Sequence, residues 1–366
     1  MTSADPTRPE PTDADPELAG PNRAGPKRAG PNRAVPERAG PKLAAVVVTY
    51  NRRAHIEATV TRLLAEPLDV LVVVDNGSDD GSREFLRAVT DPRLDLIETA
   101  DNIGGAGGFE TGLRHVVATC DPDWVVVMDD DARPEPGALA AFREAGTAGD
   151  LAGWDAVAAS VRYPDGRICE MNRPVLNPFW HPKIFLRVIS GGGRSAFHLA
   201  EADYARTTPM PVDGGSFVGM FFSRQAIGLA GYPDGRLFIY AEDGLYSMTL
   251  SEAGGRIGFF PGIRFEHDCS TFSGPPGRFT PPWKAYYYHR NLLMLYRRAA
   301  GIWFWPALLV VLPKWLWKTR AQGSDKRTYL RHLGHAIRDG LTGRVGTRAP
   351  EKGYVAAKSE CPTSAR

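Results

Sequence analysis

The chain has 366 residues, of which 43% are hydrophobic and 23% are charged, so it can bury a sizeable core and is not disordered overall. Its 44 lysines and arginines nearly balance 42 acidic residues, and this net charge of +2 argues against a dedicated nucleic-acid-binding protein. The four cysteines form no C-x-x-C pair, which disfavours a zinc module or a disulfide framework and indicates a reducing compartment.

The charge is spread unevenly along the chain. Residues 1–42 carry 7 basic and 6 acidic residues, residues 43–282 carry 21 and 32, and residues 283–366 carry 16 and 4. An acidic body is therefore joined to a strongly basic end. Such asymmetry suggests an interaction surface, for which anionic lipid and nucleic acid are the obvious partners.

The first 42 residues contain the five-residue repeat PNRAG PKRAG PNRAV PERAG. A proline at every fifth position prevents a continuous helix, and the segment has no apolar face to offset the entropy of ordering. It also lacks the apolar run of a secretory signal peptide. We expect residues 1–42 to be a disordered tail.

From Leu43 onward, buried strands alternate with helices. Leu43–Thr49 is a continuous apolar run, as expected of a parallel strand that is covered on both faces. Further strands are predicted at 70–74, 94–97, 124–128, 156–161 and 217–222, and helices at 54–65, 82–89, 107–118 and 243–253. This order predicts an α/β fold with a doubly wound sheet covered by helices, and long functional loops within 164–212.

Polar or glycine-rich segments follow the first four strands, and ligands of such sheets bind beyond the carboxyl ends of the strands. The segments are Thr49–Arg52, Asp75–Ser82, Asn102–Phe109 and Asp129–Asp131. Turn chemistry explains any one of them, because Asn, Asp and Gly end strands and cap helices. Four in succession favour a binding site.

Three adjacent carboxylates, Asp129, Asp130 and Asp131, end the fourth strand. Their mutual repulsion at the end of a buried strand is costly unless a cation compensates it. Mg²⁺ and Mn²⁺ prefer carboxylate oxygens and are often shared with substrate phosphates. A metal site is the favoured interpretation, and a solvated acidic turn is the alternative.

The glycine cluster after the third strand does not fit G-x-G-x-x-G, because the third glycine position counted from Gly105 falls on Glu110. A dinucleotide-dependent dehydrogenase is therefore disfavoured. The glycines could instead let the backbone approach a nucleotide or sugar closely.

The motifs TYNR, DNGSDDGS, NIGGAGGF and MDDDA resemble those of the family 2 glycosyltransferases, which use nucleotide-diphosphosugars. Together with LFIYAEDGLYS and EHDCS, they are particularly similar to galactofuranosyltransferases of the actinobacterial cell wall and to related rhamnosyltransferases. The resemblance covers roughly residues 43–300. It implies a GT-A fold, in which a mixed sheet is flanked by helices, and a C-terminal helical extension that associates with membranes.

The resemblance also implies roles for individual residues. Those expected to line the nucleotide and donor-sugar pocket are Thr49, Asn51, Arg52, Asp75, Asn102, Gly104 and Gly105. Asp75 would accept a hydrogen bond from the base, and Arg52 would approach the diphosphate. Asp129 and Asp131 would bind Mn²⁺ or Mg²⁺, with Asp130 assisting at the ribose or the metal.

Two further positions complete the implied site. His267 would complete the metal site, although a lone histidine is often merely structural. Asp243, next to Glu242, would act as general base on the acceptor hydroxyl. The alternative is that these two acids only cap a helix, where negative charge interacts well with the helix dipole.

The segment from Trp283 to Lys318 combines aromatic and basic residues, and four of the eight tryptophans lie within 303–317. Its uninterrupted apolar run of about 13 residues falls short of the ~20 that span a bilayer. Indoles beside cations suit the headgroup interface, so we expect this element to lie on an anionic membrane surface. A buried aromatic helix is the alternative, and nucleic-acid binding is not expected, because no recognised binding module accompanies the charge.

Together, these features predict a disordered tail over 1–42, a GT-A domain over 43–282, a basic aromatic helical extension over 283–345 and a disordered tail over 346–366. The expected function is inverting, metal-dependent transfer of a sugar, favouring galactofuranose from UDP-galactofuranose, to a lipid-linked cell-wall glycan. The alternatives are a dTDP-rhamnose-dependent rhamnosyltransferase and an inactive sugar-nucleotide-binding or membrane scaffold protein. The expected location is the cytoplasm, peripheral on the inner face of the plasma membrane.

Overall fold

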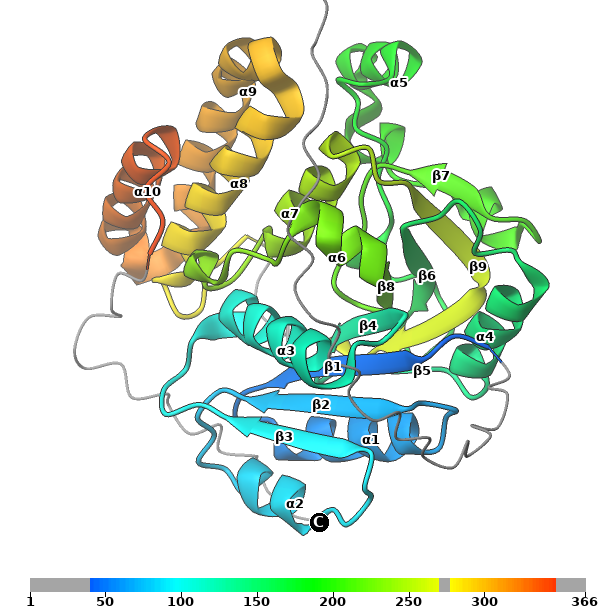
Figure 1. Ribbon diagram of the computed structural model, residues 1–366. Coiled ribbons are helices and arrows are strands. Elements are labelled where there is room, and N and C mark those ends of the chain that lie inside the picture. The colour runs from blue at the N-terminus through cyan, green and yellow to red at the C-terminus, as the bar shows by residue number, and fades with distance from the viewer. Residues whose placement is uncertain (1–39, 270–276, 347–366) are drawn as a thin grey trace, which may run out of the picture. The chain divides into compact units, whose positions relative to one another are not determined.

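Nine strands form one mixed sheet in the computed structural model, which describes residues 40–269 and 277–346. The strand order is β3-β2-β1-β4-β8-β6-β9-β5, and β7 pairs with β9 (Figure 1). The predicted tails lie outside the described residues, apart from residues 40–42 and Gly346. The mixed sheet with flanking helices confirms the expected fold class.

The first half of the sheet is parallel and confirms the predicted alternation of strands and helices. Successive residues of β1 belong to two different cores, because side chains alternate across a strand. Ala45 and Val47 pack in the core that includes α1, whereas Val46 and Val48 pack in the core that includes α3. The elements are β1 (Leu43–Thr49), α1 (Arg53–Leu64), β2 (Val70–Asp75), α2 (Ser82–Ala88), β3 (Leu94–Glu98), α3 (Gly104–Cys120) and β4 (Trp124–Asp129).

The second half of the sheet reverses direction at β8, which runs antiparallel to β4 and to β6. The strand expected at 217–222 is found at Met220–Ser223, and β9 was not predicted because Pro261 and Gly262 interrupt its apolar pattern. The elements are β5 (Ala132–Pro134), α4 (Ala138–Ala148), β6 (Ala156–Arg162), β7 (Met210–Val212), β8 (Met220–Ser223), α6 (Arg224–Ala230), α7 (Glu242–Glu252) and β9 (Ile257–His267).

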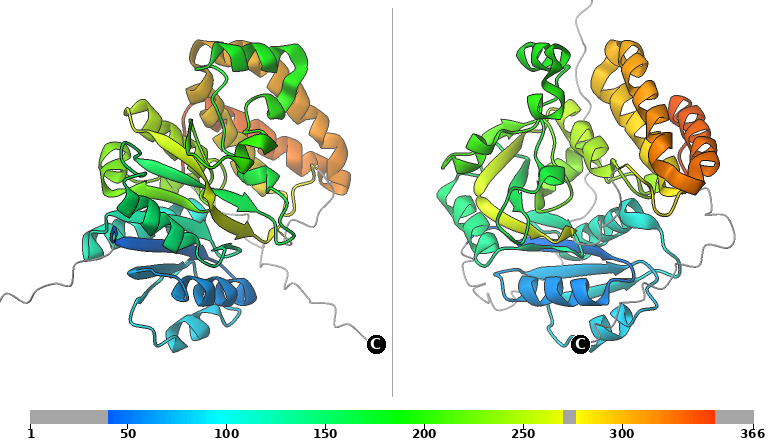
Figure 2. Two further views of the ribbon diagram at one scale, coloured as in Figure 1. Left: turned by 90° about the vertical axis from the view of Figure 1, so that its right-hand side faces the viewer. Right: turned by 180° about the vertical axis from the view of Figure 1, so that it is seen from behind.

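The region between β6 and β7, where long loops were expected, holds the short helix α5 (Pro182–Arg187) and several 3₁₀ and π turns. The Phe185 ring of α5 lies 5.3 Å from the ring of Trp303, which belongs to the C-terminal extension. Figure 2 shows these two parts side by side in both views. The loop region therefore contacts the C-terminal extension.

Three helices, α8 (Lys284–Ala300), α9 (Phe304–Trp317) and α10 (Lys326–Leu341), form the C-terminal extension. They share a core of their own, in which Trp315 and Tyr329 are buried. By length and composition alone, the helical stretch over 284–341 could cross a membrane, and no other stretch of the described residues meets that test. The stretch is divided into three helices, of which α8 and α10 pack along each other.

The glycines of α3 fit the helix closely against β1. A methyl group on Gly108 would lie 2.4 Å from a methyl carbon of Val48, and one on Gly112 would lie 2.4 Å from a methyl carbon of Val46. Such distances are far inside van der Waals contact. These two glycines are therefore explained by helix-to-sheet packing, not by contact with a ligand.

We predict opposite stability effects for two glycine-to-alanine changes inside helices. Gly112→Ala should lower the free energy of unfolding by about 1–3 kcal/mol, because the methyl group overpacks the core. Gly334→Ala in α10, where nothing lies within 4 Å of the added methyl group, should raise it by about 1 kcal/mol through helix propensity. Urea unfolding of both variants measures this; stabilisation by Gly112→Ala would contradict the packing seen here.

Candidate active site

The carboxyl ends of the parallel strands bring the predicted polar segments together. In the register of the sheet, Thr49 of β1 lies opposite Asp75 of β2, and Val48 lies opposite Asp129 of β4. Three of the predicted site residues therefore lie on one edge, because their strands end at the same level.

Asp75 is fully buried and is only half satisfied. Its Oδ1 accepts hydrogen bonds from the backbone N–H groups of Gly77 and Ser78, at 3.1 and 2.9 Å, and from Arg83 Nε at 2.7 Å. Its Oδ2 is buried without a partner. A buried carboxylate oxygen that lacks a partner is costly, so this atom is placed to accept a hydrogen bond from a ligand.

Asn51 lies at the same end of the sheet and connects two of its loops. It adopts a left-handed backbone conformation, with φ of 53°. Its N–H donates to Ser78 Oγ at 2.9 Å, and its Oδ1 accepts from the Asp79 N–H at 2.8 Å. Asn51 therefore holds the loop after β2 against the loop after β1. Arg83 was not predicted as part of the site, and Ser78 was included only as a member of the segment Asp75–Ser82.

The three adjacent aspartates experience different environments. Burial, reinforced by Asp131, raises the pKa of Asp129 to about 7. Burial also raises the pKa of Asp130 to about 6, although Arg52 opposes this shift. For Asp131, burial is outweighed by His267 and Arg52, which lower its pKa. The protein's own cations thus stabilise the ionised form of Asp131 more than that of its neighbours.

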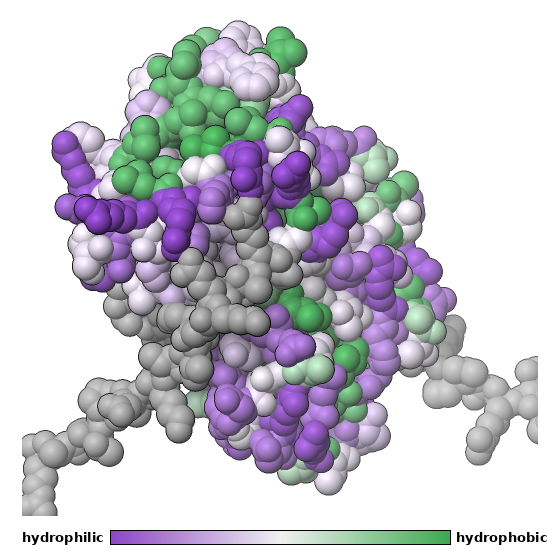
Figure 3. Space-filling model, turned by 90° about the vertical axis from the view of Figure 1, so that its left-hand side faces the viewer, coloured by the Kyte–Doolittle hydropathy of each residue, from purple (hydrophilic) through white to green (hydrophobic). Residues whose placement is uncertain are grey.

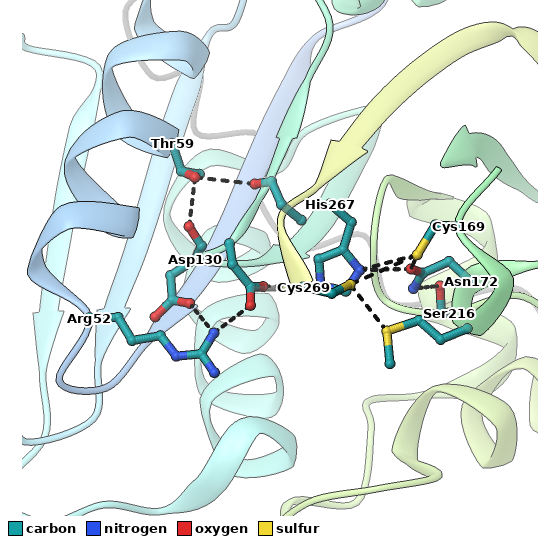
Figure 4. A network of polar contacts seen from close by, with 11 residues as sticks. Arg52, Thr59, Asp130, Cys169, Asn172, Ser216, His267 and Cys269 are labelled. Carbon is teal, nitrogen blue, oxygen red and sulfur yellow. Dashed lines mark hydrogen bonds and ion pairs between the residues drawn. The ribbon is translucent and has the colours of Figure 1, made fainter. Parts of the chain in front are cut away.

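Arg52 forms ion pairs with two of these carboxylates, Asp130 and Asp131. Its Nη1 lies 3.2 Å from Asp130 Oδ1 (Figure 4) and also donates to Asp131 Oδ2. Thr49 Oγ1 donates to Asp130 Oδ2 at 2.8 Å. Thr59 of α1 donates to the Asp130 carbonyl at 2.7 Å and so anchors the same turn. The expected approach of Arg52 to a diphosphate would start from this position beside the aspartates.

His267 reaches the aspartates from the other half of the sheet. It lies opposite Ala132 in the pairing of β5 with β9, and its Nε2 lies 3.2 Å from Asp131 Oδ1. Its Nδ1 donates to Asn172 Oδ1 at 2.7 Å. Burial alone would lower the pKa of His267, but Asp131 and the neighbouring thiols raise it to about 12.

This arrangement fits a divalent cation. Carboxylate oxygens are the ligands that Mn²⁺ and Mg²⁺ prefer, and the imidazole nitrogen would be an additional ligand. Metal-binding histidines usually donate their other N–H to a fixed acceptor, and Asn172 provides that acceptor here. Asn172 was not predicted, because it is separated from His267 by 95 residues in sequence.

Two cysteines lie on the Asn172 side of the same imidazole. Among residues 40–269 and 277–346, the one group of three candidate ligands within 4.8 Å of one another is Cys169, His267 and Cys269. The predicted trio of Asp129, Asp131 and His267 is more widely spaced. The sulfur atoms of Cys169 and Cys269 lie 3.9 Å apart. The sequence did not indicate this contact, because the two cysteines are 100 residues apart in the chain.

Asn102 and the first glycines of α3 border the opposite side of the edge. Asn102 Oδ1 accepts from the Gly104 N–H at 2.8 Å. A methyl group on Gly104 would lie 2.2 Å from the Phe238 carbonyl oxygen, so this glycine permits close contact with the loop that precedes α7. A methyl group on Gly105 would lie 3.5 Å from Glu242 Oε1. Gly105 is therefore the glycine that faces an acidic side chain.

Glu242 and Asp243 open α7, as predicted. Glu242 Oε2 is buried without a partner, and burial together with Asp243 raises the pKa of Glu242 well above its usual range. Asp129 raises it further, which places Glu242 within electrostatic reach of Asp129. Burial likewise raises the pKa of Asp243, against the opposing hydrogen bond from the Gly244 N–H at 2.6 Å.

Comparison with known proteins identifies the domain that carries this edge. A family model described as glycosyl transferase family 2 matches residues 44–162, which include β1 to β6 and the three aspartates. The chain carries a family 2 glycosyltransferase domain. The family resemblance drawn from the motifs is thus confirmed for this part of the chain.

Two bacterial relatives extend the likeness beyond this domain. The galactofuranosyltransferase GlfT1 of Mycolicibacterium smegmatis is 26% identical over 232 residues, which cover 63% of this chain and 72% of the relative. The N-acetylglucosaminyl-diphospho-decaprenol L-rhamnosyltransferase of Mycobacterium tuberculosis is 26% identical over 258 residues, which cover 63% of this chain and 78% of the relative.

Among solved structures, the chain is similar to GalNAc-T7 in complex with UDP, GalNAc and Mn²⁺. The TM-score is 0.49 at 12% identity, and the match covers 71% of this chain. The chain spans about half of that longer protein, 48% of its length.

We predict that Asn172 tunes the affinity of the aspartate edge for Mn²⁺. Asn172→Ala should weaken Mn²⁺ binding about 10–100-fold, because the His267 imidazole loses the acceptor that fixes its orientation. Asp131→Asn should weaken it more. Electron paramagnetic resonance of free Mn²⁺ in a titration measures both, and Asp165→Asn, on an exposed turn, serves as the control. Unchanged Mn²⁺ affinity in Asp131→Asn would contradict the assignment.

Proposed function

We propose that this protein is an inverting glycosyltransferase that transfers a sugar from a nucleoside diphosphate to a lipid-linked glycan acceptor. The favoured donor is UDP-galactofuranose. The observation that carries the proposal is the approach of two acidic sets to each other at one sheet edge. The aspartates after β4 lie within the region that matches the family 2 model, and Asp129 acts electrostatically on Glu242 at the start of α7.

The unpaired Oδ2 of Asp75 supports binding of a nucleobase. This atom is buried and would accept a hydrogen bond from a ring N–H. Uracil and thymine present the same N–H between two carbonyl groups, so this contact serves UDP-linked and dTDP-linked donors alike. The rhamnosyltransferase relative is as similar in identity as the galactofuranosyltransferase, and dTDP-rhamnose is therefore the alternative donor.

Asp129, Asp131 and His267 would hold Mn²⁺ or Mg²⁺, whose positive charge stabilises the leaving nucleoside diphosphate. Arg52 lies beside these residues and would contact the same phosphates. Asn172 keeps the His267 imidazole oriented toward Asp131.

The acids of α7 would act on the two sugars. Glu242 faces Gly105 and has an unpaired buried oxygen, which suits a hydrogen bond from a donor-sugar hydroxyl. Asp243 would take the proton of the acceptor hydroxyl as that oxygen attacks the anomeric carbon. The bond to the diphosphate breaks on the opposite side, so the configuration at the anomeric carbon inverts. An inactive scaffold protein would not require this pair of carboxylates. Their presence therefore favours the hypothesis of an enzyme over that of a scaffold.

The C-terminal extension would bring this site to a membrane. Large apolar side chains are exposed on α9 and on the turn before it, with exposed fractions of 85% for Ile302, 63% for Trp305, 79% for Leu309 and 65% for Trp317. Figure 3 shows an apolar area, in green, on the upper part of this face, with hydrophilic residues below it. Trp315 is buried, so the buried interpretation applies to that tryptophan, whereas the exposure of Trp303, Trp305 and Trp317 supports the interfacial interpretation for these three.

Basic residues accompany the apolar side chains. The Arg320 guanidinium lies 3.5 Å from the centre of the Trp317 ring, and Lys314 lies in the last turn of α9. Apolar residues flanked by cations match the acyl and headgroup layers of an anionic membrane. The protein would therefore lie peripherally on the inner face of the plasma membrane, where it meets a lipid-linked acceptor.

We predict that Asp243→Asn lowers kcat by about 10²–10⁴-fold, because the acceptor hydroxyl loses its general base. Nucleotide affinity should stay within about twofold, since Asp243 contacts the acceptor side. Transfer kinetics and calorimetric titration with UDP measure the two quantities. Asp121→Asn, at an exposed carboxylate paired with Arg224, is the control and should match the wild type.

The pH profile adds a second readout of the same variant. Because burial raises the pKa of Asp243, its carboxylate is lost at a higher pH than that of an ordinary aspartate. The rate of the wild type should therefore fall as pH falls through this raised pKa, and Asp243→Asn should remove that acid limb. Full transfer activity in Asp243→Asn would refute the assignment of the base.

For the membrane face, we predict that the double change Ile302→Glu and Leu309→Glu abolishes flotation with phosphatidylglycerol-containing liposomes at low salt. Buried charge in the acyl layer opposes insertion of α9. Leu229→Glu, at an exposed leucine of α6, should float like the wild type. Equal flotation of all three proteins, or none for the wild type, would contradict the interfacial role.

A further inference from the structure

A short loop, Leu237–Ala241, leads directly into the acids of α7 and has an unusual backbone. Three of its five residues have positive φ without being glycine: Phe238 at 71°, Tyr240 at 73° and Ala241 at 62°. This conformation is sparsely populated for residues with a Cβ atom. Such strain persists only where the surrounding structure holds it, and it often occurs at functional sites.

The restraint comes from α8 in the C-terminal extension. Asn291 Nδ2 lies 3.1, 2.8 and 2.9 Å from the carbonyl oxygens of Leu237, Ile239 and Tyr240. One amide nitrogen, which carries two N–H groups, thus lies within hydrogen-bond distance of three of the five carbonyls of the loop. The Asn291 side chain is fully buried, and its Oδ1 accepts from Arg290 Nε at 2.7 Å.

Arg290 strengthens this contact. It is also fully buried, and its Nη2 donates to the Leu237 carbonyl at 2.9 Å. Its guanidinium group lies 5.2 and 5.1 Å from the ring centres of Tyr286 and Tyr287. Burying a guanidinium group is costly, and hydrogen bonds to carbonyl oxygens compensate that cost. The pair therefore forms a rigid donor group against the loop.

The other side of the loop contacts the donor side of the site. The Phe238 carbonyl accepts from the Ala106 N–H in the first turn of α3, at 3.0 Å. Gly104, in the same turn, leaves just enough room for this carbonyl. The loop is thus held between α3 and α8, and the Leu245 N–H bonds the Ala241 carbonyl at 2.9 Å as α7 begins.

We propose that Asn291, supported by Arg290, is a positioning residue that holds the 237–241 loop and thereby sets the place of Glu242 and Asp243. This inference rests on the proposed function, because it assigns those two acids to the reaction. It gives the C-terminal extension a role inside the active site that is separate from membrane contact.

The first test compares Asn291→Leu with Tyr329→Phe. Tyr329 is fully buried in the same helical extension, where its hydroxyl donates to the Trp315 carbonyl at 2.7 Å and lies 3.0 Å from His289 Nε2; neither partner belongs to the loop. Asn291→Leu should lower kcat about 10–100-fold with UDP affinity within twofold, whereas Tyr329→Phe should keep kcat within twofold. An equal fall of kcat in both variants, or wild-type kcat in Asn291→Leu, would overturn the proposal.

Hydrogen–deuterium exchange separates this inference from the proposed function. In the full-length protein, Asn291→Leu should speed exchange at the backbone amides of residues 239–245, and Tyr329→Phe should not. This result is expected even if no sugar is transferred, so an inactive wild type would refute the function alone. Unchanged exchange over 239–245 in Asn291→Leu would refute the positioning role alone.

A third variant tests how the asparagine acts. Glycine adopts positive φ without strain, so Ala241→Gly in the Asn291→Leu background should recover kcat several-fold. A double variant no faster than Asn291→Leu would contradict a role in holding these dihedral angles. Asn291→Ser, which keeps one donor, replaces Asn291→Leu if the leucine variant does not fold, and its kcat should fall below that of Tyr329→Phe.

Discussion

The concentration of carboxylates at the end of buried strands is the constraint on which the rest of this structure depends. Asp75, Asp129, Asp130 and Asp131 lie where β2 and β4 end, and Glu242 and Asp243 reach the same edge from α7. Water cannot screen such charges well, so each must find a cation, a donor or a proton. Arg83 compensates Asp75, and Arg52 and His267 compensate Asp131. The raised pKa values of Asp129 and Glu242 mark where the protein's own compensation is incomplete. In our account a metal ion would compensate the charge of Asp129, and a sugar hydroxyl would donate a hydrogen bond to Glu242.

The near-neutral net charge of the chain therefore conceals two separate electrostatic arrangements. The acidic body gathers its charge around a site for a metal ion and a nucleoside diphosphate, whereas the basic end accompanies exposed tryptophans and leucines on α9. The two parts also meet physically, because Asn291 and Arg290 of α8 bind the carbonyls of the loop before Glu242. In our account the same helical extension approaches the lipid and fixes the acids that act on the lipid-linked acceptor.

Local patterns were sufficient to predict the parallel half of the sheet and the residues at its edge. The run Leu43–Thr49 and the acidic end of β4 each combine an apolar strand with polar residues directly after it, and both are found as expected. Contacts between distant segments left no such signal. The pairing of β9 with β5 and β6 brings distant residues together. It explains the contact of Asn172 with His267 and that of Cys169 with Cys269. The packing of α3 on β1 left no local signal either: Gly108, from the predicted glycine cluster, and Gly112 both make room for β1.

The central claim is that this edge performs sugar transfer and does not merely bind a nucleotide. The most direct measurement incubates the full-length protein with a polyprenyl-diphosphate-linked glycan in mixed micelles, Mn²⁺ and a panel of UDP- and dTDP-linked sugars. Mass spectrometry then detects the product, and NMR gives its anomeric configuration. Our account predicts addition of one sugar, foremost galactofuranose, with inversion at the anomeric carbon. Nucleotide binding without turnover of any donor, or a product with retained configuration, would contradict it.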